Sequence, residues 1–352
     1  MKILITGGSG FVGSNLAVYL SQKGHQVTCL DNLSRRGSEI LLSRILELGC
    51  DFVHGDIRNP EDFGKLKGSF DTLIECSAEP SVLVGTEGDD ARYMLNVNLA
   101  GSLNCFEYAR KTGAGVIFIS TSRVYPYTRL NELQFVERDT RFELKENSQG
   151  VSINGVSTKF DLKGARSLYG ATKLASEVIL EEYAHSYNMP AIINRCGVIA
   201  GPWQLGKVDQ GVFTFWLTAH YFKKNLKYIG FGGKGKQVRD LLHVLDLCEL
   251  VEKQLAALPK YRGEVFNSGG SRPVSLSLLE TTALCEEITG NKVSVMQSPE
   301  NRPADVIWYV TDNGQTEPEF GWKPKRTPKE ILQDTFNWIK ENESRFSKLF
   351  NS

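Results

Sequence analysis

Short apolar runs alternate with longer amphipathic stretches through the first half of the chain. The short runs are rich in β-branched residues and predict strands, whereas the longer stretches predict helices. Strands separated by helices in this rhythm imply right-handed βαβ crossovers, so we expect an α/β fold with a doubly wound parallel sheet. The predicted strands span residues 2–6, 26–31, 51–54, 72–75, 115–120 and 191–196, and the predicted helices span residues 11–23, 89–112 and 167–187.

The second half of the chain has a looser pattern. Gly201-Pro202 and a glycine cluster at residues 230–236 interrupt it, and only short alternating units follow. We therefore expect a smaller C-terminal lobe that closes over the carboxyl ends of the strands, where open α/β sheets bind their ligands. The predicted division is a first domain of residues 1–200, completed by about 237–270, and a substrate-binding lobe of residues 201–236 and 271–352.

Composition narrows the classes of function. The 41 Lys and Arg residues balance 41 Asp and Glu residues, so the chain lacks the basic surplus with which nucleic-acid-binding proteins neutralise phosphates. No run approaches the roughly eighteen apolar residues of a membrane span, and the N-terminus enters a glycine-rich segment without a signal-peptide cleavage site. We expect a cytoplasmic protein that binds neither nucleic acid nor membrane.

Cysteine and histidine spacing bears on disulfides and metals. The seven cysteines are scattered and none is spaced as C-x-x-C, while the five histidines show no H-x-x-x-H pattern. We therefore expect neither a disulfide framework nor a metal held by the protein.

A glycine-rich segment lies between the first predicted strand and the first predicted helix. Gly7, Gly10 and Gly13 recur at three-residue spacing within it. Such a turn needs glycine because it is tight, its backbone approaches a pyrophosphate closely, and the helix packs against the strand. The N–H groups at the helix start, at Phe11 and Val12, would then bind the anion. The alternative, an ordinary glycine turn without a ligand, is disfavoured by the strand and helix on either side.

A carboxylate stands where a ribose-binding acid is expected. Asp31 ends the second predicted strand, 18 residues after Gly13. It should accept hydrogen bonds from both ribose hydroxyls and repel a 2′-phosphate, which favours NAD over NADP as the cofactor. Arg35 and Arg36 follow and could hold that phosphate, so NADP stays open.

Tyr169 and Lys173 lie four residues apart at the start of a predicted helix and share one face. A phenol with a reference pKa of about 10 is a poor base at neutral pH, but a nearby ammonium and an oxidised nicotinamide both favour the phenolate. Lowering that pKa to about 7 needs about 4 kcal/mol, which two cations in a partly desolvated cleft can supply. Tyr169 is then a credible general base for a sugar hydroxyl.

The Y-x-x-x-K pattern alone is common by chance as a surface helix pair, so a second signal is needed. The cluster Ser120-Thr121-Ser122 ends the fifth predicted strand, and carboxyl-end positions of such sheets face the ligand. Thr121 could hydrogen-bond the same substrate oxygen as Tyr169 and stabilise developing charge, with Ser122 beside it at the substrate.

These motifs together resemble the extended short-chain dehydrogenase/reductase family, and within it the NAD-dependent sugar-nucleotide epimerases and dehydratases. TGGSGFVGSNL, GDI, NVNLAGSLN, STSRVY, YGATK and a late GW match in order over essentially the whole chain. The resemblance implies a Rossmann domain with permanently bound NAD and a catalytic set of Thr121, Tyr169 and Lys173, the last two also contacting the cofactor. The further cofactor contacts expected are Asn32, Ser34, Arg35, Asp56, Ile57, Ser77, Ala78 and Asn98.

Within the family, several segments are most similar to the subgroup of CDP-hexose 2-epimerases of the CDP-tyvelose (CDP-paratose) type. They include DNLSRRG, FVHGDIRNP, DQG, GKGKQVRDLLHVLD and VFNSGG, together with a long insertion between Thr121 and Tyr169. The resemblance implies inversion of C2 through a transient 2-keto sugar. The chain departs from the family at residues 75–79, where Glu75 stands in place of the usual histidine and Glu79 in place of the usual glutamine.

The expected partner is a nucleotide-diphosphate sugar. Arg239 and Arg302 are the candidates for its diphosphate, because guanidinium groups match phosphate oxygens and stay charged. The alternative for both is an ion pair, and for Arg302 the nearby acid is Asp305. Weaker candidates for substrate contact are Asp209 and Gln237.

Three rival functions remain. A 4,6-dehydratase would need acid and base groups to expel the C6 hydroxyl, and relatives of that type place acids after the threonine, where this chain has Ser122 and Arg123. A UDP-sugar 4-epimerase differs only in the shape of the cleft. A non-catalytic NAD-binding scaffold would not need the hydroxyl, the phenol and the ammonium together. The family also implies a homodimer or homotetramer.

Overall fold

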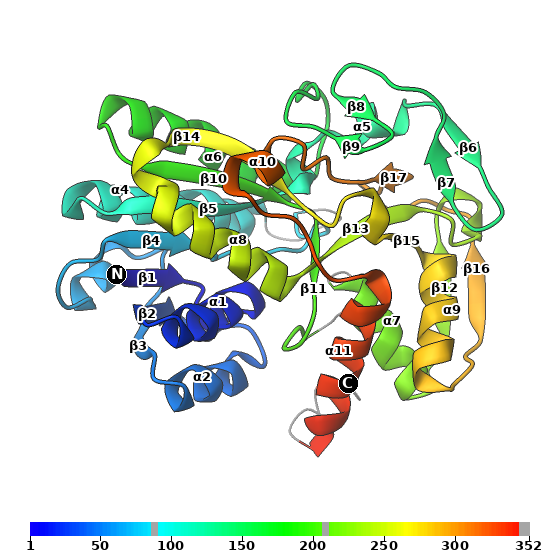
Figure 1. Cartoon of the computed structure of the whole chain (residues 1–352), viewed down its shortest axis with the longest axis horizontal. Coiled ribbons are helices and arrows are strands. Elements are labelled where there is room, and N and C mark those ends of the chain that lie inside the picture. Colours follow the sequence, from blue (N-terminus) through cyan, green and yellow to red (C-terminus); the bar gives the residue numbers. More distant parts are fainter. Residues whose placement is uncertain (86–90, 206–210, 345–352) are drawn as a thin grey trace. The chain divides into compact units, whose positions relative to one another are not determined.

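The computed structural model describes residues 1–85, 91–205 and 211–344, and the chain divides into two compact units (Figure 1). Unit 1 comprises Met1–Val124, Leu168–Arg195 and Leu247–Phe266; the rest of the described chain forms unit 2. The sequence placed residues 125–167 in the first domain, whereas they group with unit 2. The reason is their hydrogen bonding, since Phe142 N–H donates to Lys236 O at 2.9 Å and Val156 N–H to Val310 O at 2.8 Å.

Unit 1 is built on a sheet of seven strands within the described residues, in the order β14-β10-β5-β4-β1-β2-β3. The strand pairs from β3 through β5 are parallel, which confirms the expected doubly wound fold. The strands are β1 (Lys2–Thr6), β2 (Gln26–Asp31), β3 (Asp51–His54), β4 (Thr72–Glu75), β5 (Gly115–Thr121), β10 (Ala191–Cys196) and β14 (Arg262–Ser268).

Helices connect these strands, as the alternating pattern predicts. A π-helical turn, η2, separates α3 from α4 and is discussed with the site below. The α-helices are α1 (Phe11–Gln22), α2 (Ser38–Glu47), α3 (Ala91–Leu95), α4 (Gly101–Thr112), α6 (Leu168–Ser186) and α8 (Val244–Ala257); the short helical turns are η1 (Pro60–Lys65), η2 (Asn96–Ala100), η3 (Ser122–Val124) and η5 (Leu258–Lys260).

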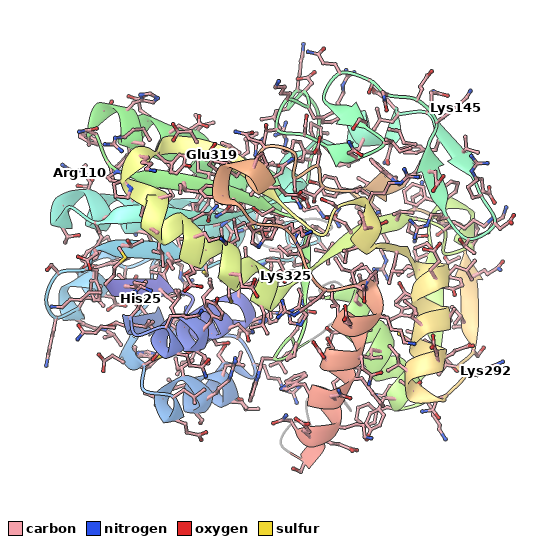
Figure 2. The ribbon with its side chains drawn as sticks, in the orientation of Figure 1. His25, Arg110, Lys145, Lys292, Glu319 and Lys325 are labelled. Carbon is pink, nitrogen blue, oxygen red and sulfur yellow. The ribbon has the colours of Figure 1, made fainter. Side chains whose placement is uncertain are left out.

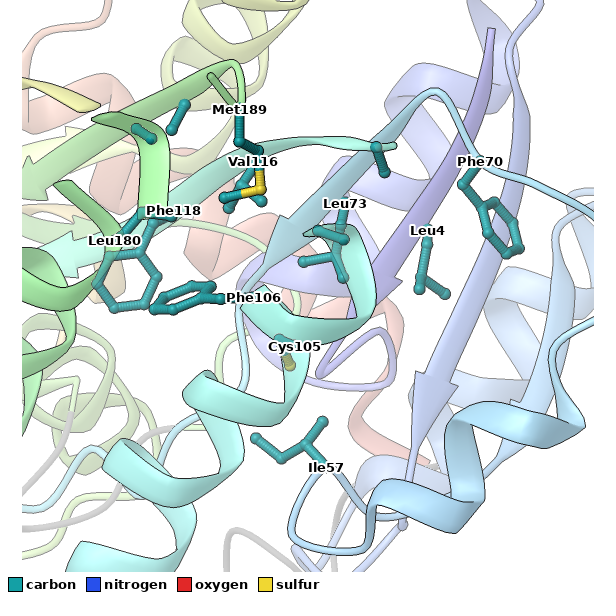
Figure 3. Packing of buried hydrophobic residues seen from close by; sticks show 14 of the residues in the cluster. Leu4, Ile57, Phe70, Leu73, Cys105, Phe106, Val116, Phe118, Leu180 and Met189 are labelled. Carbon is teal, nitrogen blue, oxygen red and sulfur yellow. The ribbon is translucent and has the colours of Figure 1, made fainter. Parts of the chain in front are cut away.

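The central strands of unit 1 are buried on both faces. Every residue of β4 and β5 is buried, as expected for parallel strands covered by helices. Phe106 of α4 meets Phe118 of β5 edge to face at 5.5 Å, and Leu180 of α6 belongs to the same apolar cluster (Figure 3). This packing fixes α4 and α6 on the sheet, and α6 carries the expected catalytic pair.

The outer surface of unit 1 is charged. On α4, Arg110 donates to Glu107 at 2.7 Å, and Lys111 lies 3.3 Å from the same carboxylate (Figure 2). Such exposed pairs stabilise a helix by only a few tenths of a kcal/mol.

Unit 2 contains a small mixed sheet in the order β11-β13-β15, with β17 paired to β13. Among the described residues, no helix is long and apolar enough to span a membrane. The strands are β6 (Phe135–Glu137), β7 (Phe142–Leu144), β8 (Val151–Ser152), β9 (Gly155–Val156), β11 (Val198–Ala200), β12 (Leu226–Ile229), β13 (Val238–His243), β15 (Ser275–Ser277), β16 (Val295–Ser298) and β17 (Trp308–Tyr309). The helices are α5 (Tyr127–Asn131), α7 (Val212–Tyr221), η4 (Phe231–Gly233), η6 (Arg272–Val274), α9 (Leu278–Thr289), α10 (Thr316–Phe320) and α11 (Pro328–Glu341).

Candidate active site

The carboxyl ends of the parallel strands bring the predicted residues to one edge of the sheet. Thr6, Asp31, Glu75 and Thr121 are the last residues of β1, β2, β4 and β5. Because parallel strands end at the same edge, residues distant in sequence become neighbours there.

The glycine turn after β1 is as tight as its sequence predicts. Gly7 has a φ of +66°, and a Cβ added to it would lie 2.9 Å from the backbone of Ser77. A Cβ on Gly13 would lie 2.2 Å from Gly7 O, so α1 packs directly onto the turn. Gly10 is the N-cap of α1 and supplies no side-chain cap. The first N–H groups of the helix are therefore left for a ligand rather than for a capping side chain.

Asp31 is held against this turn. Its carboxylate accepts hydrogen bonds from Ser9 N–H at 3.0 Å and from Leu33 N–H at 2.8 Å. Burial raises the pKa of Asp31, and these two hydrogen bonds oppose the rise. The acid and the glycine turn thus form one arrangement, as their spacing in the sequence predicts.

Asn32 and Asp56 form a second polar group beside Asp31. Asn32 donates to Asp56 at 2.9 Å and accepts a hydrogen bond from Ser34 N–H at 3.0 Å. Burial alone would raise the pKa of Asp56, but hydrogen bonds from Arg58 and Asn32 outweigh it and bring the pKa to about 2. Ile57 is buried against Gly101, and Arg35 is half-buried.

Asn98 fixes the segment that follows β4. Its side chain accepts a hydrogen bond from Glu79 N–H at 2.8 Å and donates to Glu79 O at 3.0 Å. Asn98 lies in the π-helical turn η2. Its backbone carbonyl accepts hydrogen bonds from the hydroxyl groups of Ser102, at 2.9 Å, and Ser176, at 3.1 Å. Such turns are frequent at functional sites. Asn98 therefore holds the loop that carries Ser77 and Ala78, both half-buried.

Lys173 and Tyr169 lie on α6, in its first two turns. Lys173 is 1% exposed; its ammonium lies 4.0 Å from the centre of the Phe118 ring and 3.5 Å from Glu75 Oε2. Tyr169 is half-buried on the same helix face. Thr121 is 8% exposed at the end of β5, where its hydroxyl accepts a hydrogen bond from Arg123 N–H at 3.1 Å.

A second buried ion pair anchors α6 to β10, and the same carboxylate is hydrogen-bonded to β5. Glu177, one turn beyond Lys173, accepts a hydrogen bond from the Ser120 hydroxyl and pairs with Arg195 at 2.7 Å. The sequence patterns predicted no role for Glu75, Glu177 or Arg195. Their signal was the presence of charged residues inside otherwise buried elements, a pattern that is rare without a partner.

The residues of unit 2 that were predicted to contact the substrate are partly buried or already paired. Arg239 donates to Asp305 at 2.6 Å, which is the ion pair weighed as the alternative to diphosphate binding. Arg302 is half-buried, and Gln237 is buried with its Oε1 lacking a hydrogen-bond partner among the described residues. Asp209 lies outside the described residues. In unit 1, Ser122 is half-buried at the start of η3.

Comparison with known proteins identifies the family. The family model described as "NAD dependent epimerase/dehydratase family" matches residues 3–269. The chain belongs to this family. The CDP-paratose 2-epimerase of Salmonella typhi is 33% identical over 345 residues, covering 96% of this chain and 99% of that protein. A dTDP-glucose 4,6-dehydratase of Mycobacterium tuberculosis is 28% identical over 349 residues, covering 98% of this chain and 95% of that protein.

Solved structures agree with the family. The UDP-glucose 4-epimerase of Thermotoga maritima with UDP-glucose has a TM-score of 0.77 at 25% identity, covering 97% of this chain and 100% of that chain. The enzyme of Thermus thermophilus in complex with NAD also has a TM-score of 0.77 at 25% identity, with coverage of 97% and 99%. The expected family, enzyme class and NAD cofactor are confirmed: the chain is an NAD-dependent sugar-nucleotide epimerase of this family.

The residues of unit 1 fit this cofactor. A side chain at Gly7 or Gly13 would collide with backbone, so only glycine leaves the turn open for a pyrophosphate. Asp31 ends β2 beside that turn, where the adenosine ribose of a dinucleotide lies. The individual cofactor contacts remain predictions.

Proposed function

We propose that the protein inverts C2 of a CDP-hexose of the paratose/tyvelose type. The proposal is carried by the similarity to the CDP-paratose 2-epimerase, which extends over 96% of the chain. It is supported by the arrangement in unit 1, where a buried lysine and a half-buried tyrosine share one face of α6.

In this proposal Tyr169 removes the proton from the C2 hydroxyl and later returns it. Lys173 contributes positive charge that favours the phenolate, and Thr121 donates a hydrogen bond to the same sugar oxygen. NAD held at the glycine turn and Asp31 would supply a reversible hydride acceptor for C2, so that no net oxidation occurs. Because the 2-keto sugar can present its opposite face before it is reduced, the stereocentre inverts.

Inversion requires a firm grip on the diphosphate and a loose grip on the hexose. Arg239 and Arg302 remain our candidates for the diphosphate. Arg239 lies 2.6 Å from Asp305, so a diphosphate at this arginine would share its guanidinium group with that carboxylate. Gln237, Asp209 and Ser122 are proposed to contact the sugar or its nucleotide.

The dehydratase alternative needs an acid and a base beside the reacting carbons. Ser122 and Arg123 follow Thr121 at the end of β5, so neither residue is a carboxylic acid. This composition favours epimerisation, in which one phenol handles the only proton that moves.

Incubation with a panel of CDP- and UDP-hexoses in deuterated water, followed by NMR of the sugar ring, tests the proposed function. Inversion at C2 without deuterium at carbon is expected, because the same hydrogen leaves and returns. Inversion at C4 of a UDP-sugar, or loss of water with deuterium at carbon, would replace the proposal with the 4-epimerase or the dehydratase. No reaction from protein that releases NAD on heating would favour the non-catalytic scaffold.

A further inference from the structure

The strand β4 ends on a carboxylate inside the core of unit 1. Glu75 follows Thr72, Leu73 and Ile74, and its side chain is completely buried. Its Oε2 lies 3.5 Å from the ammonium of Lys173, which is 1% exposed. Its Oε1 has no hydrogen-bond partner among the described residues.

A buried acid is costly unless something compensates it. Burial raises the pKa of Glu75, and the ammonium of Lys173 opposes that rise. The two side chains come from elements 98 residues apart in sequence. Together they form an ion pair of zero net charge, whereas a lysine without an acid would place one full positive charge on the face of α6 that carries Tyr169.

The other ionisable groups around this pair do not duplicate the role of Glu75. Glu177 of α6 is already paired with Arg195 of β10. Cys105 of α4 is fully buried, and burial raises the pKa of its thiol well above its usual value, so the thiol stays neutral. The Lys173 ammonium also lies over the face of the Phe118 ring, which stabilises the cation without cancelling its charge.

We propose that Glu75 is a positioning residue that holds the Lys173 ammonium and cancels part of its charge, so that Tyr169 loses its proton at a higher pH than it would beside a lone lysine. The inference rests on the proposed function for the role of Tyr169. The ionisation of Tyr169 can be measured without a substrate, so the effect of Glu75 on it can be tested without turnover.

The test is a spectroscopic titration of Tyr169 in the NAD-loaded enzyme. Phenolate absorbance at 295 nm is recorded against pH, and the Tyr169→Phe protein is subtracted to isolate one tyrosine. In Glu75→Gln protein the titration should move to lower pH by about two units, the size expected for one charge across a helix turn at an effective dielectric of about 20. An unchanged titration, or one that moves to higher pH, would overturn the proposal.

Three further variants separate charge from packing. Glu75→Asp keeps the negative charge, so Tyr169 should titrate within about 0.3 pH unit of its midpoint in the parent protein. Glu107→Gln removes a half-buried carboxylate of α4 that is paired with Arg110, and it should leave the titration in place, because the partner and the solvent screen that charge. In a Lys173→Met background, Glu75→Gln should have no effect, because an unpaired buried carboxyl group is already neutral. A shift in that background, or with Glu107→Gln, would contradict action through Lys173.

Folding and function are followed in parallel. Lys173→Met combined with Glu75→Gln should recover stability lost in either single variant, since the cost arises from leaving one buried charge without its partner. In a plot of kcat/KM against pH, the acid limb should move in the same direction as the titration of Tyr169. A titration that shifts in a protein that inverts no sugar supports the role of Glu75 and contradicts the proposed function.

Discussion

At the scale of single residues, the site depends on charges that are buried and paired. Lys173 and Glu177 lie one turn apart on α6. Lys173 pairs with Glu75 of β4, and Glu177 pairs with Arg195 of β10. Removing one member of such a pair typically costs about 3–5 kcal/mol, because the remaining charge stays desolvated. The pairs therefore hold α6 in register with β4, β5 and β10, and with it the position of Tyr169.

Tyr169→Phe should abolish most of the activity. The variant keeps the ring and loses only the ionisable oxygen, so the epimerisation rate should fall by roughly 10²–10⁴-fold while NAD stays bound. Rates are measured by NMR of the inverted sugar, and bound NAD by absorbance after heat release. Tyr187→Phe, just beyond α6 and 54% exposed, is the matched control. Unchanged epimerisation in the Tyr169 variant would remove the proposed base.

Asp240 of unit 2 should make stability depend on pH. Its carboxylate accepts hydrogen bonds from Gly270 and Ser271 N–H groups, at 2.8 and 3.3 Å, but burial raises its pKa to about 6. A carboxyl group whose folded pKa lies above its unfolded value of about 3.8 stabilises the fold fully below that value, and this contribution is lost as the pH rises through about 6.

The Asp240→Asn protein isolates this effect. Its free energy of unfolding, measured by urea titration at several pH values, should rise relative to the parent protein by about 2 kcal/mol between pH 4 and pH 7. Other groups cancel in the comparison because both proteins share them. A difference between the two proteins that does not change with pH would show that Asp240 does not titrate in this range.

At the scale of elements, the β1–α1 turn shows how backbone geometry prepares a ligand site. Gly7 takes a positive φ and Gly13 lies against Gly7 O, so the chain reverses within a few residues and α1 begins at once. No side chain caps α1 at Gly10, which leaves the positive end of the helix dipole available to an anion.

Gly13→Ala should disrupt NAD binding. The added Cβ would lie 2.2 Å from Gly7 O, and neither atom belongs to a flexible side chain, so the turn must open. We expect purified protein to retain less than roughly a tenth of its NAD, measured as nucleotide released on heating. Gly64→Ala is the control, since a Cβ there meets nothing within 4 Å. Full NAD content in the Gly13 variant would contradict the packing described here.

The helix α11 carries a complete capping box. Thr327 accepts a hydrogen bond from Glu330 N–H at 3.3 Å, and Glu330 accepts one from Thr327 N–H at 2.7 Å. Thr327→Ala should lower the free energy of unfolding by about 1 kcal/mol, whereas Thr327→Ser should keep most of it. Urea unfolding of the three proteins measures both effects. Equal losses in the alanine and serine variants would show that the methyl group, rather than the cap, matters.

At the scale of the whole molecule, the residues expected to carry the chemistry all belong to unit 1. Unit 2 contributes the arginine candidates for the diphosphate, together with the insertion of residues 125–167. Within unit 2 that insertion is held by Arg141, which donates to Glu280 at 2.8 Å and to Ser275 at 3.0 Å. The chain thus separates the reacting groups from the candidate phosphate ligands by unit.

Self-association is expected through the helices of unit 1. Tyr93 and Leu95 of α3 and Val178 of α6 are exposed apolar side chains, 38–58% accessible, on helices that contact each other. Burying such a patch favours association. Sedimentation at micromolar protein should show a dimer or tetramer, and Val178→Glu should shift it towards monomer. Monomer alone for the parent protein would refute the expectation.

Local patterns of residues were enough to predict the strands and the chemical groups they carry. The expected strands at residues 2–6, 26–31, 51–54, 72–75 and 191–196 coincide with those of the structure, because each is a short run with an apolar, mostly β-branched centre that is bounded by turn residues. The glycine turn and the shared face of Tyr169 and Lys173 depend on spacing over a few residues, which is also local. These features do not require knowledge of any distant partner.

Which distant residues meet becomes known only once the chain is folded. Local pattern does not encode the pairing of Glu75 with Lys173, of Arg239 with Asp305, or the addition of β14 to the edge of the sheet. The insertion likewise joined unit 2 through Phe142 and Val156, although it lies between two segments of unit 1. Such pairings follow from how strands and helices pack, since a buried polar group is satisfied by whichever partner the packing brings near.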